Sequence, residues 1–328
     1  MRVLVTGGAG FIGSNFVRRL VASGCESVVV VDALTYAGTQ KNLADIPSSA
    51  LSFFRINICD SAALATVFAD HDIQQVVHFA AESHVDRSIA SADPFTMTNV
   101  VGTQRLLDVC RKAGIERFIH VSTDEVYGSL QPHDAPFTES SPLQPNSPYA
   151  ASKAASDLMV RSYHQTFDFP AIITRCSNNY GPYQFPEKLI PLMIYNATHN
   201  KPLPIYGDGQ NIRDWVHVHD HCDALLRVLT HGQLGECYNI GGTCEQTNQS
   251  VVTTILDTLG VSHDHITYVA DRLGHDFRYA ISHDKITTQL GWFPKIPFAH
   301  GIMETIQWYT DHTEWLEHVM ASNKAVAQ

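Results

Sequence analysis

The sequence predicts an α/β protein with a doubly wound parallel sheet and a smaller second lobe. In the first half, short runs of β-branched residues alternate with helical patterns. Apolar strands that alternate with helices are typical of a parallel sheet covered on both faces. After residue 175 this alternation gives way to loop-rich segments. We therefore expect a Rossmann-type domain over residues 1–175 and a C-terminal substrate-binding lobe over residues 176–328.

Each expected element follows from its local pattern. Strands are expected at residues 2–6, 27–32, 51–56, 75–79, 117–122 and 171–175. Helices are expected at residues 11–22, 61–69, 94–113 and 148–164. A later helix, near residues 217–230, is expected to return to the first domain. Because no linker or repeat separates the two halves, the sequence predicts tightly joined lobes.

The composition is that of a globular protein, with 44% hydrophobic and 17% charged residues. The formal net charge of -11 argues against nucleic acid or an anionic membrane as a partner. No apolar run reaches the roughly eighteen residues that span a bilayer. The chain enters a glycine loop at Gly7, too early for a signal peptide. These observations predict a cytoplasmic protein.

The cysteines and histidines do not predict a metal site. The seven cysteines are scattered and form no Cys-x-x-Cys pair, so buried thiols are the simpler interpretation. His217, His219 and His221 alternate, as ligands on a metal-binding strand can do. The same segment fits a helix entrance capped by Asp220. We favour surface or hydrogen-bonded histidines and expect no metal.

A glycine-rich run from Gly7 to Gly13 lies between the first expected strand and helix. Gly7 permits the tight turn, Gly10 lets the backbone approach a pyrophosphate, and Gly13 allows close helix–sheet packing. The helix N-terminus supplies donors for the phosphates. Asp32 ends the second strand, where a carboxylate binds ribose hydroxyls and repels a ribose phosphate. The pattern favours NAD over NADP, and a cofactor site over a turn that binds nothing.

A redox site is predicted where the fifth strand ends. Thr123 follows that strand, and Tyr149 and Lys153 have the i, i+4 spacing that shares one helix face. A nearby ammonium stabilises tyrosinate, so Lys153 is expected to bring the Tyr149 pKa down from about 10. Tyr149 then takes the proton of a substrate hydroxyl that Thr123 holds. A Tyr-x-x-x-Lys pair is often a surface pair, but the glycine loop and Thr123 favour the catalytic interpretation.

Asp124 and Glu125 extend this chemistry beyond a plain dehydrogenase. A ketone acidifies the hydrogen on the neighbouring carbon, because the resulting carbanion is stabilised as an enolate. We expect Glu125 to remove that hydrogen and a protonated Asp124 to donate to the departing hydroxyl. The alternative, two carboxylates at the start of a solvated loop, leaves the adjacent motif unexplained. The sequence therefore predicts dehydration through a transient ketone.

Longer runs extend these motifs over nearly the whole chain. Besides the glycine loop, they occupy residues 32–38, 80–88, 123–125, 178–191 and 211–215. On these runs the chain resembles the dTDP-glucose 4,6-dehydratases of the extended short-chain dehydrogenase/reductases. The runs at 80–88 and 123–125 are specific to dehydratases, whereas the glycine loop is shared across the superfamily. Sugar-nucleotide epimerases of the same fold generally lack the Asp-Glu pair.

The resemblance implies a reaction cycle and an assembly. Asp124 is the acid, Glu125 the base and Tyr149 the alcohol base. The cycle oxidises carbon 4 of the glucosyl ring, removes water across carbons 5 and 6, and returns the hydride to carbon 6. NAD is regenerated each time and is tightly held. By analogy the helices at 94–113 and 148–164 pair in a four-helix interface, which gives a homodimer.

The resemblance also implies which residues bind the two ligands. The NAD set is Gly7, Gly10, Phe11, Ile12, Gly13, Asp32, Leu34, Thr35, Tyr36, Asn57, Ile58, Ala80, Ala81, Thr98, Tyr149, Lys153 and Asn179. The set for the sugar and its phosphates is Ser83, Thr123 and Asn178. The nucleotide-diphosphate set is Lys188, Leu189, Pro204, Ile205, Tyr206, Arg213, Asn248, Arg272 and His275. Arginines suit a pyrophosphate, and a tyrosine ring can stack on a pyrimidine.

Two departures from the family pattern keep alternatives open. Asn57 replaces a usual aspartate, and its amide oxygen can still accept a hydrogen bond from the adenine amino group. Leu273 and Phe277 replace a usual proline and arginine beside the nucleotide pocket. UDP-glucose is the main competing substrate, since a methyl or hydroxyl difference is worth only ~1–3 kcal/mol. A 4-epimerase and an NAD-binding regulatory or scaffolding protein are the remaining alternatives.

Overall fold

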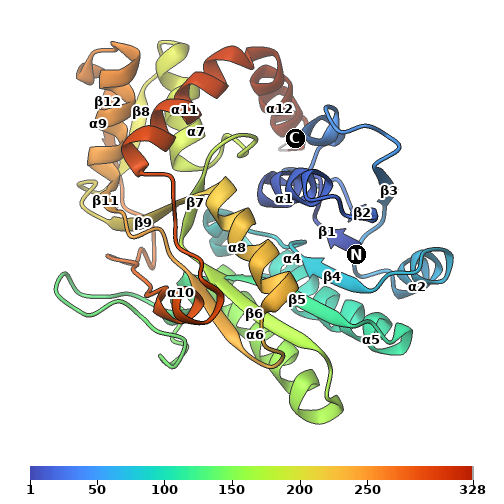
Figure 1. The fold of residues 1–328 in the computed structure, drawn as a ribbon. Helices are drawn as coiled ribbons and strands as arrows, with labels where there is room; N and C mark the ends of the chain where they lie inside the picture. Colours follow the sequence, from blue (N-terminus) through green and yellow to red (C-terminus); the bar gives the residue numbers. More distant parts are fainter. Residues whose placement is uncertain (327–328) are drawn as a thin grey trace.

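The computed structural model of the chain describes residues 1–326, with side chains up to Ala321. Figure 1 shows a central sheet with helices on both sides, and a second group of helices and short strands beside it. Within the described residues, no helix is long and apolar enough to cross a membrane.

The central sheet has seven strands, and every neighbouring pair is parallel. In spatial order they are β3 (Leu51–Arg55), β2 (Ser27–Asp32), β1 (Arg2–Thr6), β4 (Gln75–His78), β5 (Arg117–Thr123), β6 (Ala171–Cys176) and β10 (Cys237–Ile240). The first six agree with the expected strands to within a residue at each end. The order reverses direction at β1, as in a doubly wound sheet, so the predicted fold class is confirmed.

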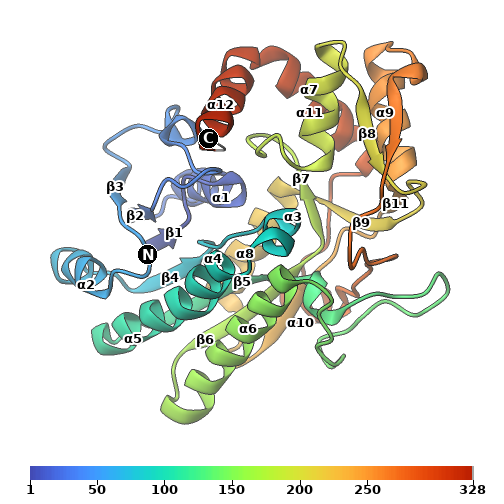
Figure 2. The same cartoon turned by 180° about the vertical axis from the view of Figure 1, so that it is seen from behind.

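Helices cover both faces of this sheet and form two apolar cores with it. On one face lie α1 (Phe11–Ala22), α8 (Val218–His231) and α10 (Asp284–Leu290). On the other face lie α2 (Ser61–Asp70), α5 (Thr103–Ala113) and α6 (Pro148–Phe167). Figure 2 shows α5 and α6 side by side along the second face. The strands are therefore buried on both sides, which explains their continuous apolar runs.

The helix expected at 94–113 is helical throughout but not regular. It begins as α4 (Asp93–Phe95), continues as a π-helical turn, η2 (Thr96–Gly102), and becomes α5 only at Thr103. The Thr103 hydroxyl donates to the Asn99 carbonyl oxygen at 2.6 Å within this turn. A Cβ on Gly102 would lie 2.8 Å from Ile58 Cδ1, so glycine permits the close packing here. The sequence also gave no sign of the short helix α3 (Val85–Ala90).

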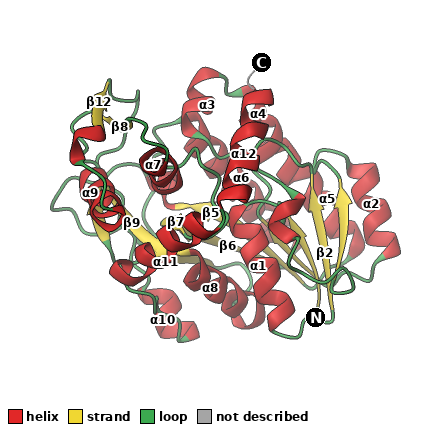
Figure 3. Ribbon diagram, turned by 90° about the horizontal axis from the view of Figure 1, so that it is seen from above, coloured by secondary structure: helices red, strands yellow, loops and turns green. Residues whose placement is uncertain are grey.

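The second lobe has its own small sheets and core. A three-stranded sheet contains β7 (Asn178–Tyr180), β9 (Ile212–His217) and β11 (Glu245–Thr247), and a parallel pair contains β8 (Leu203–Tyr206) and β12 (Ile266–Val269). Their helices are α7 (Leu189–Thr198), α9 (Asn248–Leu259), α11 (Phe298–Asp311) and α12 (Thr313–Val326). Seen from above in Figure 3, α7, α9 and the β8–β12 pair lie to one side of the central sheet.

After β9 the chain passes back to the central sheet through α8 and β10. Helix α8 packs against α1, and β10 then forms the edge strand of the main sheet. The expected capping residue was wrong. His217, not Asp220, caps α8 by accepting the His219 N–H at 3.3 Å. Asp220 instead accepts the backbone N–H groups of Lys295 and Ile296, because its position in the first turn faces that segment.

The glycine loop allows a direct test of how closely the start of α1 packs against the end of β1. A Cβ at residue 13 would lie 2.2 Å from the Gly7 carbonyl oxygen, whereas one at residue 10 would lie 3.3 Å from it. We expect Gly13→Ala to lower the free energy of unfolding by about 3 kcal/mol, since a backbone neighbour cannot move aside cheaply. Gly10→Ala, the matched control, should change it by less than about 1 kcal/mol. Urea unfolding without added ligand measures both, and equal losses would contradict the packing argument.

Candidate active site

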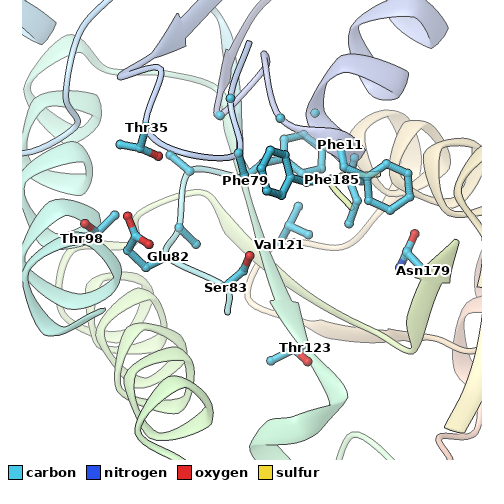
Figure 4. A pocket seen from close by; sticks show the side chains of 18 of the residues that line it. Phe11, Thr35, Phe79, Glu82, Ser83, Thr98, Val121, Thr123, Asn179 and Phe185 are labelled. Atoms are coloured by element: carbon cyan, nitrogen blue, oxygen red, sulfur yellow. The ribbon is translucent and has the colours of Figure 1, made fainter. Parts of the chain in front are cut away.

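One long cavity opens where the carboxyl ends of the parallel strands meet. Its lining includes Gly7 after β1, Asp32 of β2, Phe79 after β4, Thr123 of β5 and Cys176 of β6. Parallel strands present their carboxyl ends at the same edge of a sheet, and ligands bind there in open α/β sheets. Figure 4 shows side chains from several of these elements facing the same space.

Most of the predicted site residues line this cavity, although they span residues 7–188. From the NAD set, the lining contains Gly7, Gly10, Phe11, Ile12, Gly13, Asp32, Thr35, Asn57, Ile58, Ala80, Ala81, Thr98, Tyr149, Lys153 and Asn179. From the catalytic and sugar sets, it contains Thr123, Asp124, Glu125, Ser83 and Asn178, and from the nucleotide set Lys188.

The remaining predicted residues do not line it. They are Leu34, Tyr36, Leu189, Pro204, Ile205, Tyr206, Arg213, Asn248, Arg272 and His275. The Leu34 N–H donates to Asp32 Oδ1 at 2.8 Å, and the Tyr36 hydroxyl donates to Glu187 Oε1 at 3.0 Å. Ile205 is only 1% exposed and packs in the core of the second lobe.

The structure adds lining residues that sequence reasoning missed, among them Phe79, Glu82, Val121, Phe185 and Glu187. Phe79 and Val121 stood at the ends of predicted strands, and this position was the available signal. Figure 4 places Glu82 near Thr98 of the π-helical turn. The Asn99 side chain fixes this segment, because its Oδ1 accepts the Glu82 N–H at 2.8 Å and its Nδ2 donates to the Glu82 carbonyl oxygen.

The glycine-loop end of the cavity has the features of a dinucleotide cradle. Gly10 caps α1 without a side chain, and the first turn of α1 carries no acidic residue. The backbone N–H groups there are free to bind a pyrophosphate. A Cβ on Gly7, whose φ is +68°, would lie 2.7 Å from the Ala80 nitrogen. Gly7 thus packs the loop against the segment after β4, and the uncapped start of α1 fits a ligand that carries phosphates.

Asp32 stands beside this cradle at the end of β2. Its Oδ2 accepts the Ala9 N–H at 2.9 Å and its Oδ1 the Leu34 N–H at 2.8 Å, so backbone donors fix the carboxyl group. Burial raises the pKa of Asp32. Asn57 also lines the cavity, and its Oδ1 accepts the Cys59 N–H at 2.8 Å. A carbonyl-type oxygen has a second lone pair, so a further hydrogen bond remains open to it.

Helix α6 carries the Tyr–Lys pair into the same cavity. Lys153 Nζ donates to the Val121 carbonyl oxygen of β5 at 2.9 Å, and burial lowers the Lys153 pKa to about 8. Burial, and then the charge of Glu125, raise the Tyr149 pKa well above its ordinary value, while the Thr123 hydroxyl opposes the rise. The expectation that Lys153 brings this pKa down was wrong for the protein alone, because burial, and then the charge of Glu125, raise it.

Thr123 begins the turn that holds both carboxyl groups. Its Oγ1 accepts the Glu125 N–H at 3.2 Å and so caps the 3-10 turn η3 (Asp124–Tyr127). Burial, followed by the charges of Glu125 and Asp214, raises the Asp124 pKa well above its ordinary value. Asp124 Oδ2 is buried and has no hydrogen-bond partner among the described residues. The raised pKa and the unpartnered oxygen both favour the protonated form of Asp124.

Glu125 has a different environment from its neighbour. Burial raises its pKa, but the positive charges of Lys188, Arg272 and Arg213 oppose the rise. Two adjacent carboxyl groups are thus separated in proton affinity by their surroundings. Arg213 is 5% exposed, and among the described residues its guanidinium donates to the backbone carbonyl oxygens of Ile212, Asp276 and Phe277. A buried cation without a partner carboxylate suits an anionic ligand.

The histidines and cysteines make other contacts in the part of the chain that the structure describes. Among the described residues, no group of three or more His, Cys, Asp or Glu side chains could hold a metal ion. His221 Nδ1 lies 2.8 Å from Asn179 Oδ1, and His217 is the helix cap described above. All seven cysteines are free thiols.

The fold and the site define an enzyme of the extended short-chain dehydrogenase/reductase type. A dinucleotide cradle, a Tyr–Lys pair and an Asp–Glu pair share one cavity, which is the equipment for reversible alcohol oxidation combined with acid–base elimination.

Comparisons with known proteins narrow this class. The family model described as GDP-mannose 4,6 dehydratase matches residues 4–305. The dTDP-glucose 4,6-dehydratase of Shigella flexneri is 51% identical, with 97% of this chain and 95% of that protein covered. The dTDP-glucose 4,6-dehydratase of Neisseria meningitidis is 50% identical, with 97% and 96% covered. The chain belongs to the dTDP-glucose 4,6-dehydratase family.

Solved structures agree with this assignment. The crystal structure of DesIV, a dTDP-glucose 4,6-dehydratase from Streptomyces venezuelae with NAD and dTDP bound, matches with a TM-score of 0.95 at 51% identity, covering 97% of this chain and all of that one. A UDP-glucose 4-epimerase of Thermus thermophilus in complex with NAD matches with a TM-score of 0.89 at 31% identity, covering 95% of this chain and 100% of that one.

The raised pKa of Asp124 predicts a pH-dependent stability. The folded protein keeps this proton at pH values where the unfolded chain has released it, so stability falls as pH rises from about 4 toward the folded pKa. Asparagine has no proton to release, so Asp124→Asn should gain stability relative to the wild type as pH rises. Urea unfolding at about pH 5 and about pH 8 measures this. A stability difference that is constant with pH would contradict a protonated Asp124.

Proposed function

We propose that this chain catalyses the NAD-dependent dehydration of dTDP-glucose to dTDP-4-keto-6-deoxyglucose. The reaction oxidises carbon 4, eliminates water across carbons 5 and 6, and returns the hydride to carbon 6. The observation that carries the proposal is the meeting of Asp124 and Glu125 with Tyr149 and Lys153 at one cavity. The relatives at about half identity over nearly the whole chain, named as dTDP-glucose 4,6-dehydratases, support it.

NAD binds at the glycine-loop end of the cavity. Backbone N–H groups at the start of α1 hold its pyrophosphate, and Asp32 accepts hydrogen bonds from its ribose hydroxyls. When bound, NAD supplies the hydride acceptor and a positive charge on the oxidised nicotinamide ring. On this assignment, residues 1–175 with α8 and β10 hold the cofactor, and the rest of residues 176–328 hold the nucleotide sugar.

Tyr149 and Thr123 act in the oxidation. Thr123 holds the carbon-4 hydroxyl, and Tyr149 accepts its proton. A buried tyrosine needs positive charge nearby to be ionised, because burial and Glu125 raise its pKa. Lys153, held by the Val121 carbonyl oxygen, provides such a charge from one helical turn away. The ketone stays in the product, so Tyr149 has to pass on the proton it has taken, and Asp124 has to regain the proton it gives to the departing water. Glu125 returns its own proton to carbon 5 when hydride returns to carbon 6, so the net change is the loss of one water.

Asp124 and Glu125 act in the elimination. Glu125 removes the proton from carbon 5, which the ketone has acidified, and the carbon–oxygen bond at carbon 6 breaks. Asp124 gives its proton to the departing hydroxyl, which leaves as water. The raised pKa of Asp124 keeps that proton available, and the cations around Glu125 favour its ionised form.

The nucleotide diphosphate lies toward the second lobe. Arg213, Arg272 and Lys188 surround Glu125 with positive charge and suit a pyrophosphate. Tyr206 is 40% exposed and offers a ring face for a pyrimidine. Leu273 stands beside Arg272, where the family usually has proline. Its side chain is 77% exposed, so it does not cover the Arg272 side chain. The preference for dTDP over UDP therefore depends on the base pocket.

Mass spectrometry of the product tests the proposed function. The purified protein is incubated separately with dTDP-glucose and UDP-glucose, without added reductant. We expect the loss of one water from dTDP-glucose, and slower loss from UDP-glucose, since a missing methyl group weakens binding by ~1–3 kcal/mol. An unchanged mass with an altered sugar configuration would indicate a 4-epimerase. No change with either sugar would support a protein that binds NAD without catalysis.

Glu125→Gln is the matched control in this assay, because it keeps the shape of the side chain and removes the base. We expect water loss to fall by about 100-fold or more, within the range for a positioned general base. Full activity of Glu125→Gln beside an active wild type would assign the base to another group.

We also propose a cytoplasmic homodimer. Met97 on η2 and Leu158 and Phe167 on α6 are about half exposed, and such apolar side chains on neighbouring helices favour a second copy of the chain. The free thiols suit a reducing compartment, which cell fractionation can check. Light scattering should give twice the chain mass of 36.3 kDa for the wild type and a smaller mass for Leu158→Asp. A wild-type mass of one chain would contradict the dimer.

A further inference from the structure

The two pairs of catalytic side chains stand on different elements. Tyr149 and Lys153 belong to helix α6, whereas Asp124 and Glu125 belong to the turn η3. The proposed reaction needs both pairs on one substrate, so the spacing between α6 and η3 has to be held. A displacement of about 1 Å can slow an enzymatic step about 100-fold.

One buried side chain contacts both elements. Arg175 on β6 donates from Nε to Asp157 Oδ2 of α6 at 2.8 Å, and from Nη1 to the Tyr127 hydroxyl of η3 at 2.8 Å. Its guanidinium carbon also lies 4.9 Å from the centre of the Tyr127 ring. A guanidinium is planar and presents its donors in fixed directions, so it can set the positions of two partners at once.

The contact on the α6 side is joined to the Tyr–Lys pair by the helix itself. Tyr149, Lys153 and Asp157 follow at intervals of four residues and share one face. His120 Nε2 of β5 lies 3.4 Å from Asp157 Oδ1 and 3.1 Å from Ser156 Oγ. Asp157 is 1% exposed and His120 is fully buried. Charge and hydrogen bonding thus fix this face of α6 against the sheet.

The contact on the η3 side is equally enclosed. Tyr127 ends η3, two residues after Glu125, and is 1% exposed. Its hydroxyl accepts from Arg175 and donates to Asn239 Oδ1 of β10 at 2.8 Å. Its ring stacks on Phe137 with centroids 5.1 Å apart. Any shift of η3 would therefore break hydrogen bonds in a site that excludes water.

We propose that Arg175 is a positioning residue that couples the oxidation pair, Tyr149 and Lys153, to the elimination pair, Asp124 and Glu125, through Asp157 and Tyr127. This inference rests on the proposed function, since it assigns each arm of the Arg175 network to one step of that reaction. Arg175 is 7% exposed and lies outside the cavity lining, so it acts through its two partners.

A purely structural role does not account for this arrangement. A buried ion pair gains little net stability over apolar side chains of similar volume, because desolvation offsets the attraction. Apolar residues could join β6, α6 and η3 without fixed directions. A network of directional hydrogen bonds that ends on two catalytic elements supplies orientation instead.

Substitutions that remove one Arg175 contact at a time separate its effect on the elimination pair from its effect on the oxidation pair. Tyr127→Phe removes the hydroxyl on the η3 side, and we expect water loss to slow by about tenfold, the rate equivalent of one net hydrogen bond, with little change in hydride transfer. In a single turnover the absorbance of reduced nicotinamide should then accumulate before product appears. Tyr163→Phe is the matched control. It also removes a phenol hydroxyl, but one that lies on α6, bonds to Asp108 and is away from η3.

Asp157→Asn removes the charge that Arg175 contacts on α6, and it should slow hydride transfer more than water loss. Asp157 and Cys176 favour the charged form of Lys153, whereas burial disfavours it, and the uncharged imidazoles of His78 and His120 face it from β4 and β5. Without the Asp157 charge, Lys153 loses its proton at lower pH. The alkaline limb of the pH profile for hydride transfer should therefore move to lower pH in Asp157→Asn and stay in place in Tyr127→Phe.

A readout without cofactor or substrate completes the test. Hydrogen exchange of the backbone amides at residues 123–128 should be faster in Tyr127→Phe and Arg175→Lys than in the wild type, and unchanged in Tyr163→Phe. Equal slowing of both steps in Tyr127→Phe, with unaltered exchange, would overturn the inference. So would unfolding of both Tyr127→Phe and Arg175→Lys while Tyr163→Phe folds, because Arg175 would then hold the fold alone. No product from the wild type would instead refute the proposed function.

Discussion

The parallel hydrogen-bonded sheet is the constraint on which the rest of the structure depends. Because all seven strands run the same way, six of them bring their carboxyl ends to one cavity. The cradle, Asp32, Thr123 and Cys176 are neighbours for this reason alone, although they are far apart in sequence. Residues 178 and 179 of the second lobe follow directly after β6, so the chain enters its substrate-binding part at the same edge.

The site residues at this edge of the sheet could be predicted from the sequence, because the patterns that indicate them are local. Gly10 and Gly13 contact the loop itself within one βα turn, and Tyr149 and Lys153 share one face of one helix. Thr123 and Asp32 follow from where strands end. The nucleotide set was assigned by resemblance instead, and most of it, including Arg213 and Tyr206, lies outside the cavity lining. Its arrangement depends on contacts between β8, β9 and the 271–277 loop, which no local pattern encodes.

The remaining differences come from tertiary contacts that override local preferences. Asp220 looks like a helix cap in sequence, but the segment at Lys295 and Ile296 packs against α8 and takes its carboxylate. The π-helical turn at 96–102 interrupts a sequence that reads as one helix. Glu82 and Glu187 stayed unnoticed because a carboxylate gives no periodic signal, and its place in a cavity depends on distant partners.

Burial raises the pKa values of the carboxyl and phenol groups in the site and lowers that of its lysine. The sequence could not reveal the size of these shifts. The same low-dielectric cavity raises the pKa values of Asp124 and Tyr149 and lowers that of Lys153 to about 8. An alcohol base in such a place depends on nearby positive charge, such as that of Lys153 one helical turn away. The cations near Glu125 oppose the rise of its pKa, whereas burial and the charge of Glu125 raise the pKa of Asp124. The division between acid and base is therefore a property of the folded cavity, and Arg175 fixes the distance at which the two halves of the site share it.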